Sequence, residues 1–313
     1  MKRLGLIGAR GHTGAQLIRL VARHPQFELC LASSRQHDGE RIADHVEEVD
    51  NNDLRFRLVD AQALASEDLD ALILALPNGL AAPYVEAWRG GGHDGPIIDL
   101  SADYRFDQSW YYGLPELTRT GAVGQTHISN PGCYATAMQL ALAPLRDLLV
   151  GTPVCFGVSG YSGAGTTPSD RNDPIKLRDN LMPYAPFDHL HEKEVTAHLG
   201  HRVRFLPHVA EFFRGISLTV TTQLQDGVRQ SDIEARMHGT YDDEPLVHVL
   251  DAPPWVAANA GRHHACVGGW RRRDDEFVIY ATLDNLLKGA ATQAVQNLNL
   301  ACGYAELEGI PFD

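Results

Sequence analysis

Long apolar stretches are absent from this chain of 313 residues. No segment approaches the roughly 20 consecutive apolar residues that a membrane-spanning helix requires. The apolar N-terminus ends at Ala9 and Arg10 follows, so residues 3–9 are interpreted as a first strand rather than a signal peptide. We therefore expect no membrane partner.

Cysteine is scarce and irregularly placed. The five cysteines are odd in number, widely spaced and include no Cys-x-x-Cys pair, which argues against a disulfide framework and against a structural zinc site. The 15 histidines are scattered as well, so no metal site is expected. Free cysteines are typical of a reducing cytoplasm, where we expect this chain to reside.

The chain also has no excess of basic residues. Lys and Arg number 27 against 40 Asp and Glu, for a net charge of −13. This balance argues against nonspecific binding of nucleic acid, so no nucleic-acid partner is expected. The hydrophobic fraction of 44% and the charged fraction of 21% are those of a soluble globular protein, and the length suits two domains.

The first 130 residues alternate between apolar runs and a helical pattern. Strands are predicted over residues 3–9, 27–32, 69–76 and 96–100, with a helix over 13–23. The run at 69–76 is nearly all apolar, as in a strand buried on both faces of a parallel sheet. The alternation predicts an α/β domain of the Rossmann type with a parallel sheet.

After about residue 150 the pattern changes. Residues 216–224 and 277–283 alternate apolar and polar positions, which predicts an α+β domain with a mixed or antiparallel sheet covered on one face. Residues 160–186 are rich in Gly, Pro, Ser, Asp and Asn and are interpreted as a long functional loop. A helical pattern over 285–301 follows near the end.

A glycine-rich segment connects the first predicted strand to the first predicted helix. It reads Gly-Ala-Arg-Gly-His-Thr-Gly; glycines let the backbone approach a pyrophosphate, and a helix N-terminus favours the anion. The spacing differs from the commoner Gly-x-Gly-x-x-Gly, and an ordinary tight turn is the alternative. The expected dinucleotide contacts are Gly8, Arg10, Gly11, His12, Thr13 and Gly14.

The end of the second predicted strand bears on the choice of dinucleotide. The place usually held by a ribose-binding Asp or Glu is occupied by Ser33, Ser34 and Arg35. A carboxylate would repel a 2′-phosphate, whereas hydroxyls and a guanidinium bind it. We therefore predict NADPH/NADP as the cofactor rather than NAD; the alternative is that Arg35 is only a solvated loop residue.

Residues 130–136 read Asn-Pro-Gly-Cys-Tyr-Ala-Thr, and a helical pattern begins at Cys133. A cysteine at a helix N-terminus is expected to have a lowered pKa, because the positive end of the helix dipole favours the thiolate. The alternative, a buried structural cysteine, suits the other four cysteines better, namely Cys30, Cys155, Cys266 and Cys302. Beside a nicotinamide, the thiolate of Cys133 can attack an activated acyl carbon to give a thioester, which hydride then reduces to an aldehyde.

Seven motifs occur in an order that resembles one enzyme family. They are residues 8–14, 99–105 (Asp-Leu-Ser-Ala-Asp-Tyr-Arg), 112–116 (Tyr-Gly-Leu-Pro-Glu), 130–136, 159–165 (Ser-Gly-Tyr-Ser-Gly-Ala-Gly), 207–208 with 214–215 (Pro-His and Arg-Gly), and 284–290 (Asp-Asn-Leu-Leu-Lys-Gly-Ala). Together, from about residue 3 to about residue 302, they resemble the N-acetyl-γ-glutamyl-phosphate reductases, NADPH-dependent enzymes of arginine biosynthesis. The fold and reaction class also resemble those of aspartate-semialdehyde dehydrogenase.

The resemblance implies an acyl-phosphate substrate, N-acetyl-γ-glutamyl phosphate, that is reduced to N-acetylglutamate 5-semialdehyde through a thioester on Cys133. It also implies a discontinuous dinucleotide domain, residues 1–132 and 285–313, and a catalytic and oligomerisation domain, residues 133–284. A homo-oligomer, either a dimer or a tetramer, is expected on the same ground. The further cofactor contacts expected are Pro77, Ser159, Gly160, Ser162, Gly163 and Asn285.

Two positions depart from the family pattern. The family usually has an arginine after Ser-Gly-Ala-Gly, where this chain has Thr166. In the family stretch His-Arg-His-Thr-Pro-Glu, the arginine is replaced here by Leu190. If those arginines hold an anionic substrate, another cation must substitute. The candidates are Arg105, Arg171, Lys176 and Arg214.

Proton transfer near neutral pH suits a histidine. His191 is the first candidate for the general acid and base and His189 the second, since both lie in the stretch that matches the family's histidine pair; His208 is the third. Arginines suit an anionic substrate, although Arg105 has the alternative of pairing with a neighbouring aspartate. The substrate-binding residues expected are Asn130, Arg105, His208 and Arg214.

Three alternatives remain open. The substrate could be another acyl phosphate, such as aspartyl phosphate or an α-aminoadipate derivative, and assays with a panel of semialdehydes would separate these. The chain could instead be a cysteine hydrolase, which predicts no NADPH binding. It could also be a non-catalytic regulatory protein that binds NADPH, which predicts that Cys133→Ser leaves its function intact.

Overall fold

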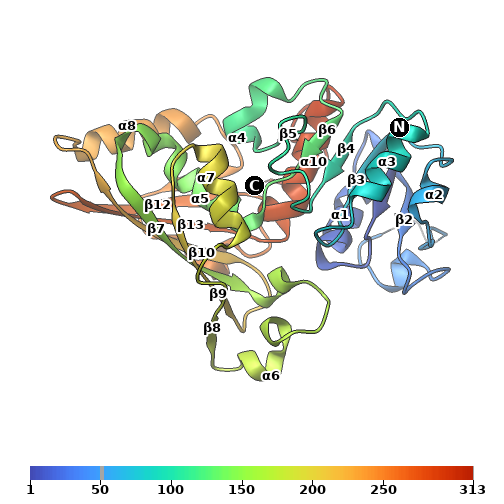
Figure 1. Cartoon of the computed structure of the whole chain (residues 1–313), viewed down its shortest axis with the longest axis horizontal. Coiled ribbons are helices and arrows are strands. Elements are labelled where there is room, and N and C mark those ends of the chain that lie inside the picture. Colours follow the sequence, from blue (N-terminus) through green and yellow to red (C-terminus); the bar gives the residue numbers. More distant parts are fainter. Residues whose placement is uncertain (50–52, 313) are drawn as a thin grey trace. The chain divides into compact units, whose positions relative to one another are not determined.

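The computed structural model describes residues 1–49 and 53–312, which form two compact units (Figure 1). The first unit comprises residues 1–131 and 290–311, and the second is formed mainly by residues 132–289. The first unit is therefore discontinuous. The limits expected from the resemblance, residues 132 and 285, differ from these by one and five residues.

The sheet of the first unit has six strands in the order β2-β1-β3-β4-β6-β5, all parallel to their neighbours, which confirms the predicted α/β class. The strands are β1 (Lys2–Ile7), β2 (Phe27–Ser33), β3 (Ala71–Leu74), β4 (Ile97–Asp99), β5 (Tyr111–Tyr112) and β6 (His127–Ser129). The helices and helical turns are α1 (His12–Ala22), η1 (Ile42–Asp44), α2 (Ala61–Leu64), α3 (Ala82–Gly90), α4 (Pro115–Thr118), η2 (Arg119–Gly121) and α10 (Thr292–Ala301).

Burial explains why these segments fold as they do. All four residues of β3 are inaccessible to solvent, as the all-apolar run predicted. Helix α1 buries one face, including Leu17, Ile18 and Val21, and exposes the other. The strand order reverses at β1, which has β2 on one side and β3 on the other. In such sheets, ligands bind outside the carboxyl ends of the strands at this point of reversal.

The sheet of the second unit has seven strands in the order β11-β12-β13-β10-β7-β9-β8, with parallel and antiparallel pairs. The predicted mixed sheet is confirmed. The strands are β7 (Leu149–Gly160), β8 (Leu181–Pro183), β9 (Arg204–Ala210), β10 (Ile216–Leu224), β11 (Val247–Leu250), β12 (Ala265–Arg273) and β13 (Glu276–Leu283). The helices and helical turns are α5 (Cys133–Leu142), η3 (Ala143–Leu148), η4 (Tyr161–Ala164), η5 (Asp170–Asn172), α6 (Pro174–Leu177), α7 (Leu190–Leu199), α8 (Gln230–Tyr241), α9 (Val256–Asn259) and the π-helix η6 (Leu287–Ala291).

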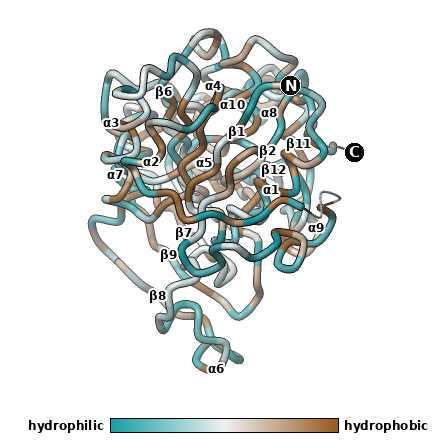
Figure 2. Tube along the Cα trace, turned by 90° about the vertical axis from the view of Figure 1, so that its right-hand side faces the viewer, coloured by the Kyte–Doolittle hydropathy of each residue, from teal (hydrophilic) through white to brown (hydrophobic). Residues whose placement is uncertain are grey.

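Helices cover one face of this mixed sheet. Helix α5 is buried from its second residue to its last and packs on β10, β12 and β13; its hydrophobic character is visible in Figure 2. Helix α7 packs on α5 and on β9. The other face is open, because Val150, Val154 and Phe156 alternate with buried residues along β7 and are exposed. Coverage of one face was the pattern that the sequence predicted.

The segment predicted as a long loop, residues 160–186, has a local structure of its own. Ser169 and Asn172 form a capping box around η5, and the Asn172 amide also donates to the carbonyl oxygens of Gly165 and Thr167. The Asp173 carboxylate then accepts from the N–H of Ile175 and caps α6. Short polar side chains that bind the nearby backbone are what order this segment.

In the described ranges 1–49 and 53–312, no helix has the length and apolarity needed to cross a bilayer.

Candidate functional site

The glycine-rich segment lies in the first unit, at the carboxyl end of β1. Gly8 has φ +85°, and a Cβ atom there would lie 2.3 Å from the carbonyl oxygen of Ala75. A Cβ at Gly14 would lie 2.5 Å from the carbonyl oxygen of Ala9. Gly11 is the N-cap of α1, and a Cβ atom there would meet only the carbonyl oxygen of Gly8, at 3.7 Å. Two glycines are thus required by packing, and the third leaves the N-terminus of α1 accessible to an anion, so the segment fits a pyrophosphate.

The residues predicted to select the 2′-phosphate lie at the end of β2, beside that segment, but they differ in availability. The Ser33 hydroxyl is buried and bonds both the carbonyl oxygen and the N–H of Val59. The Ser34 hydroxyl accepts from the N–H of His37, 3.2 Å away, and retains its own proton to donate. Arg35 is exposed. Arg10 bonds to the Gln36 side chain, which brings a second guanidinium to the same turn.

Further along the same edge, Arg105 holds the backbone that leads to the second unit. Its guanidinium is buried and donates to the carbonyl oxygens of Asn130 (3.0 Å) and Leu100 (2.9 Å). Burial raises the pKa of the nearby Asp99 carboxyl to about 6, although hydrogen bonds from Ser101 oppose the shift. These contacts give Arg105 a role in shaping the turn at residue 130.

The side chain of Asn130 is bonded within the first unit. Its amide donates to the carbonyl oxygen of Ala290, 3.3 Å away, and its Oδ1 accepts from Asn297 of α10. Pro77, the other residue expected at this edge, is exposed just after β3.

Cys133 is the first residue of α5 in the second unit, where the helical pattern predicted it. Gly132 is the N-cap, with an extended ψ of 151°, and its N–H donates to Oε1 of Glu194 at 2.9 Å. Glu194 is fully buried and belongs to α7. The turn before the thiol is therefore fixed to the helix that carries His191. In the sequence, Glu194 matches the final residue of the family stretch His-Arg-His-Thr-Pro-Glu, a match that implies no role for it.

Gly289 was also missed. A Cβ atom at this position would lie 2.7 Å from the Cβ of Cys133 and 3.0 Å from a methyl group of Leu283. The backbone of η6 thus lies against the nucleophile, and only glycine permits that approach. In the sequence, Gly289 stands inside the motif of residues 284–290 and inside a helical pattern, but neither assigned it a role.

The two candidate histidines have different environments. His189 is the N-cap of α7, and its Nδ1 accepts from the N–H of His191 at 3.1 Å. Burial, followed by the nearby charge of Arg171, lowers the pKa of His189 to about 4. Its imidazole is therefore neutral at pH 7 with the proton on Nε2. The ring of His191 lies 5.0 Å from that of His189 and 6.0 Å from that of Tyr134, the neighbour of Cys133.

Two tyrosines complete the surroundings of the thiol. Tyr134 is buried, and its hydroxyl donates to the carbonyl oxygen of His208 at 2.8 Å. Tyr184 lies within electrostatic reach of Cys133 and of the Tyr134 hydroxyl, and burial raises the pKa of Tyr184 well above its usual value. Neither side chain was predicted to take part in the site, although Tyr134 stands in the quoted motif of residues 130–136.

The structure does not bring the His208 side chain to this group. Along β9, Phe205 faces Tyr134 and His189, and His208, three residues later, points to the opposite face of the sheet. There its ring lies 4.5 Å from that of Phe156.

The predicted cofactor residues of the second unit come together around Asn285. Its amide nitrogen donates to the Ser162 hydroxyl at 2.9 Å, and its Oδ1 accepts from the N–H of Gly215 at 2.7 Å. A Cβ at Gly163 would lie 2.9 Å from the Ser159 hydroxyl oxygen, so this glycine permits a close packing. Gly160 likewise packs against the backbone of residues 212–214. Ser159, Ser162 and Asn285 are buried and Gly163 is exposed, so a ligand can reach the cluster at Gly163.

Two of the candidate substrate cations are paired with carboxylates. The Arg214 guanidinium lies 2.6 Å from the buried carboxylate of Asp284. Lys176 lies 2.5 Å from Asp170 on the exposed loop.

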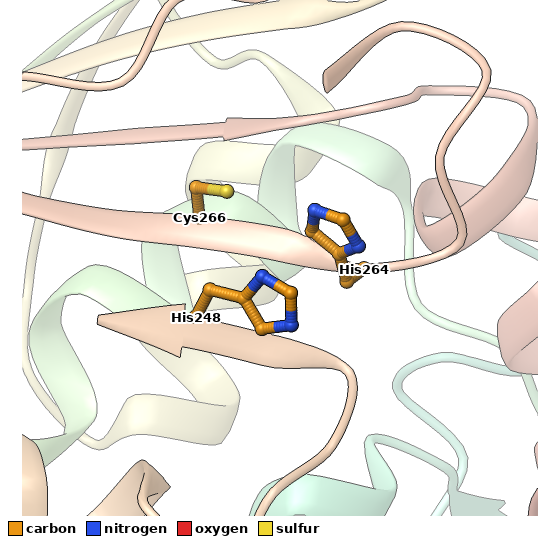
Figure 3. Close-up of side chains that lie close together, drawn as sticks. All are labelled: His248, His264 and Cys266. Carbon is orange, nitrogen blue, oxygen red and sulfur yellow. The ribbon is translucent and has the colours of Figure 1, made fainter. Parts of the chain in front are cut away.

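Three potential metal ligands meet elsewhere in the second unit, on β11 and the start of β12 (Figure 3). Parallel pairing of His248 with Cys266 places them side by side, and His264 precedes Cys266 by two residues on the same face. The Cys266 thiol donates to Oδ1 of Asn259, and burial raises its pKa to about 11. The two imidazoles are stacked at 3.9 Å with planes 24° apart. The potential ligand atoms of the three side chains all lie within 4.8 Å of one another.

The chain matches two family models in sequence order. Residues 3–125 match "Semialdehyde dehydrogenase, NAD binding domain". Residues 133–285 match "Semialdehyde dehydrogenase, dimerisation domain". The two matches coincide closely with the dinucleotide-type and mixed-sheet units described above.

Several relatives are similar to the chain over nearly its full length, and each is an N-acetyl-γ-glutamyl-phosphate reductase. The relative from Stenotrophomonas maltophilia is 58% identical over 98% of both chains. The relative from Xanthomonas oryzae pv. oryzae is 57% identical with the same coverage. The one from Xylella fastidiosa is 56% identical over 99% of this chain and 93% of the relative.

Solved structures of aspartate semialdehyde dehydrogenases share the fold. Enzyme II from Vibrio cholerae has a TM-score of 0.76 at 17% identity, covering 96% of this chain and 98% of that one. The Candida albicans enzyme with NADP has a TM-score of 0.71 at 14% identity, covering 96% and 100%. At these identities the similarity to the solved structures shows only a common fold. The family follows from the family models and from the relatives. The chain belongs to the semialdehyde dehydrogenase family and, within it, to the N-acetyl-γ-glutamyl-phosphate reductases.

Proposed function

We propose that this protein uses NADPH to reduce N-acetyl-γ-glutamyl phosphate to N-acetylglutamate 5-semialdehyde and phosphate, a reaction of arginine biosynthesis. The setting of Cys133 carries the proposal. Its thiol stands at the first position of a buried helix, and the preceding turn is bound through Glu194 to the helix that bears His191. Relatives at 56–58% identity bear the name of this enzyme.

The chemistry begins at Sγ of Cys133. The thiolate attacks the acyl carbon, the bond from that carbon to the phosphate oxygen breaks, and phosphate departs with the electron pair. The first N–H groups of α5 favour the negative charge that develops on the acyl oxygen. NADPH, when bound, supplies the hydride that reduces the resulting thioester. Release of the aldehyde returns the thiolate.

His191 is the proposed general acid and base. The Nδ1 of His189 already accepts a hydrogen bond that caps α7. Because the pKa of His189 is lowered to about 4, its imidazole is neutral at pH 7 and does not act as an imidazolium acid. The His191 side chain is half-buried next to Tyr134. The backbone N–H of His191, not its ring, donates to Nδ1 of His189. His189 is therefore better suited to orient α7 than to transfer protons.

NADPH is the proposed dinucleotide in preference to NADH. Ser34, Arg35 and Arg10 supply one hydroxyl and two guanidinium groups at the end of β2, and no carboxylate stands at Ser33, Ser34 or Arg35. A 2′-phosphate gains charge-assisted hydrogen bonds from such donors. Ser33 contributes through its bonds to Val59, which fix the turn.

Turnover by Cys133→Ser tests the proposal directly. Wild-type protein is expected to form NADPH from NADP⁺, phosphate and N-acetylglutamate 5-semialdehyde. The variant should lose this turnover and keep NADPH binding, measured by the fluorescence of the bound nucleotide. Absence of NADPH binding by the wild type would favour a cysteine hydrolase instead. Faster turnover with aspartate semialdehyde would favour the other acyl-phosphate substrate.

A homodimer, or a tetramer built from such dimers, is proposed for the assembly. The family model over residues 133–285 carries the description of a dimerisation domain. Within that range the sheet leaves apolar side chains exposed on its open face, among them Val154 and Phe156. A second copy of the same face would bury them. We further propose that the enzyme works in the cytoplasm, since a thiolate nucleophile requires a reducing compartment.

A further inference from the structure

We infer that Arg171 binds the free carboxylate of the acyl substrate, at the end of the chain remote from the phosphate. This inference rests on the proposed function, and it assigns the substrate's second anionic group to one named side chain.

Arg171 is held by an ordered turn. It lies in η5, between the Ser169 and Asn172 of the capping box, and Asn172 also bonds the carbonyl oxygen of Gly165 at 2.9 Å. The turn is therefore folded back onto the end of the 159–165 segment. Thr166, where the family usually has an arginine, belongs to the same stretch of backbone. A cation five residues later thus occupies the same folded loop.

Arg171 has no carboxylate partner among the residues that the structure describes. The carboxylate of the neighbouring Asp170 forms an ion pair with Lys176 at 2.5 Å. The one recorded contact of Arg171 is with an aromatic ring: the guanidinium carbon lies 4.9 Å from the centre of the Tyr184 ring. Stacking uses the face of the guanidinium and leaves the N–H donors along its edge for a ligand. The side chain is exposed, so a ligand can reach it.

The other candidate cations are less available. Arg214 is paired with the buried Asp284, and Arg105 donates to backbone carbonyl oxygens. Adding a second carboxylate to the Arg214 pair would bring two negative charges together. Arg171 can accept a substrate carboxylate without breaking an existing ion pair.

The position of Tyr184 indicates that Arg171 binds the carboxylate of the substrate rather than its phosphate. One face of the Tyr184 ring carries Arg171, while its hydroxyl lies within electrostatic reach of Cys133 and its ring centre lies 5.6 Å from that of His189. The phosphate is attached to the carbon that Sγ attacks and must lie next to the thiol. The guanidinium carbon of Arg171 lies 4.9 Å from the centre of the Tyr184 ring, so Arg171 contacts this ring rather than the thiol. A glutamyl chain, whose carboxylate is several bonds away from the reacting carbon, has the length to reach across the ring.

The charge of Arg171 also acts on the N-cap of α7. It is the second cause, after burial, of the lowered pKa of His189. This places the guanidinium near α7 and its histidines without placing it in contact with the reacting atoms.

The test uses the reverse reaction, in which the semialdehyde and phosphate are varied separately. Arg171→Gln should raise the KM for N-acetylglutamate semialdehyde by about 10- to 100-fold, the loss typical of a charge-assisted pair. The KM for phosphate, the kcat and the affinity for NADPH should stay within about twofold. Arg171→Lys should recover part of the loss because it keeps the charge without the planar fork.

Two controls sharpen the result. Arg178→Gln removes the same charge from another exposed position of the loop and should leave both KM values unchanged. A semialdehyde analogue with a carboxamide in place of the carboxylate should be used equally poorly by the wild type and by Arg171→Gln. A rise in the KM for phosphate alone would overturn the inference, as would unchanged KM values. An inactive wild type would instead remove the proposed function itself.

Discussion

Gly289 is the residue at which the smallest change should cost the most activity. Gly289→Ala would place a methyl group 2.7 Å from the Cβ of Cys133, closer than real contacts allow. The nucleophile or the η6 backbone must shift, and shifts near 1 Å at a reacting group can cost about 100-fold in rate. We expect kcat to fall at least tenfold while NADPH binding is retained.

Gly239→Ala is the matched control for that prediction. Gly239 lies inside α8, and a Cβ atom there would meet nothing within 4 Å. The change should leave kcat unaltered and stabilise the protein by up to about 1 kcal/mol, because alanine is the better helix former. Equal activity of both alanine variants would show that the approach of Gly289 to Cys133 is unimportant.

Arg35 should govern the choice between dinucleotides. Arg35→Gln removes a guanidinium from the end of β2, and the KM for NADPH should rise about 10- to 100-fold while the KM for NADH changes little. Steady-state kinetics with both cofactors measure the ratio. Arg23→Gln, at the end of α1 where Arg23 pairs with Glu48, should leave that ratio unchanged. A parallel rise in both KM values for Arg35→Gln would contradict a 2′-phosphate contact.

At the scale of elements, the start of α7 should make stability depend on pH. The folded pKa of His189 is about 4 against an ordinary 6.5, so the unfolded chain binds more protons between these values. The stability that comes from the neutral imidazole is present above pH 6.5 and is lost as the pH falls toward 4. His189→Asn keeps a good N-cap and removes this titration.

Urea unfolding at pH 5 and pH 7 measures the effect. The difference in the free energy of unfolding between the two pH values should be smaller for His189→Asn than for the wild type. Activity at pH 7 should persist in the variant if His191 transfers the proton. Loss of all turnover in a folded His189→Asn protein would instead assign the proton transfer to His189.

At the scale of the whole molecule, the open face of the mixed sheet should hold the oligomer together. Phe156 is 37% exposed on this face, and Phe156→Asp would place a charge in the interface between copies. The variant should elute as a monomer in size-exclusion chromatography with light scattering. Val123→Asp, at a 72% exposed residue of the first unit, should leave the assembly unchanged. A monomeric wild type would remove the proposed role of this face.

Features set by local pattern were predictable. The all-apolar run became the buried strand β3, the glycine segment became the turn into α1, and Cys133 became the first residue of α5. Each depends on periodicity, on turn chemistry or on capping within about ten residues, and none of these requires knowledge of a distant contact.

Pairings across the fold were not predictable. His208 was assigned to the substrate, yet strand alternation turns its side chain to the other face of β9. Arg214 was a free cation in the sequence, and the fold pairs it with Asp284, 70 residues away. The local pattern of one sequence does not reveal such partners, because strand register and packing across the whole sheet decide them.

The sequence by itself determined that this is a two-domain α/β and α+β protein with a dinucleotide turn and a cysteine at a helix start. These follow from local backbone preferences and from ordered motifs. Only the tertiary structure decided how the cysteine is held, by the bond from Gly132 to Glu194 and by the close approach of Gly289. It also left Arg171 stacked on Tyr184, with no carboxylate partner among the residues that the structure describes. Such contacts join segments far apart in the chain, and their geometry exists only in the packed molecule.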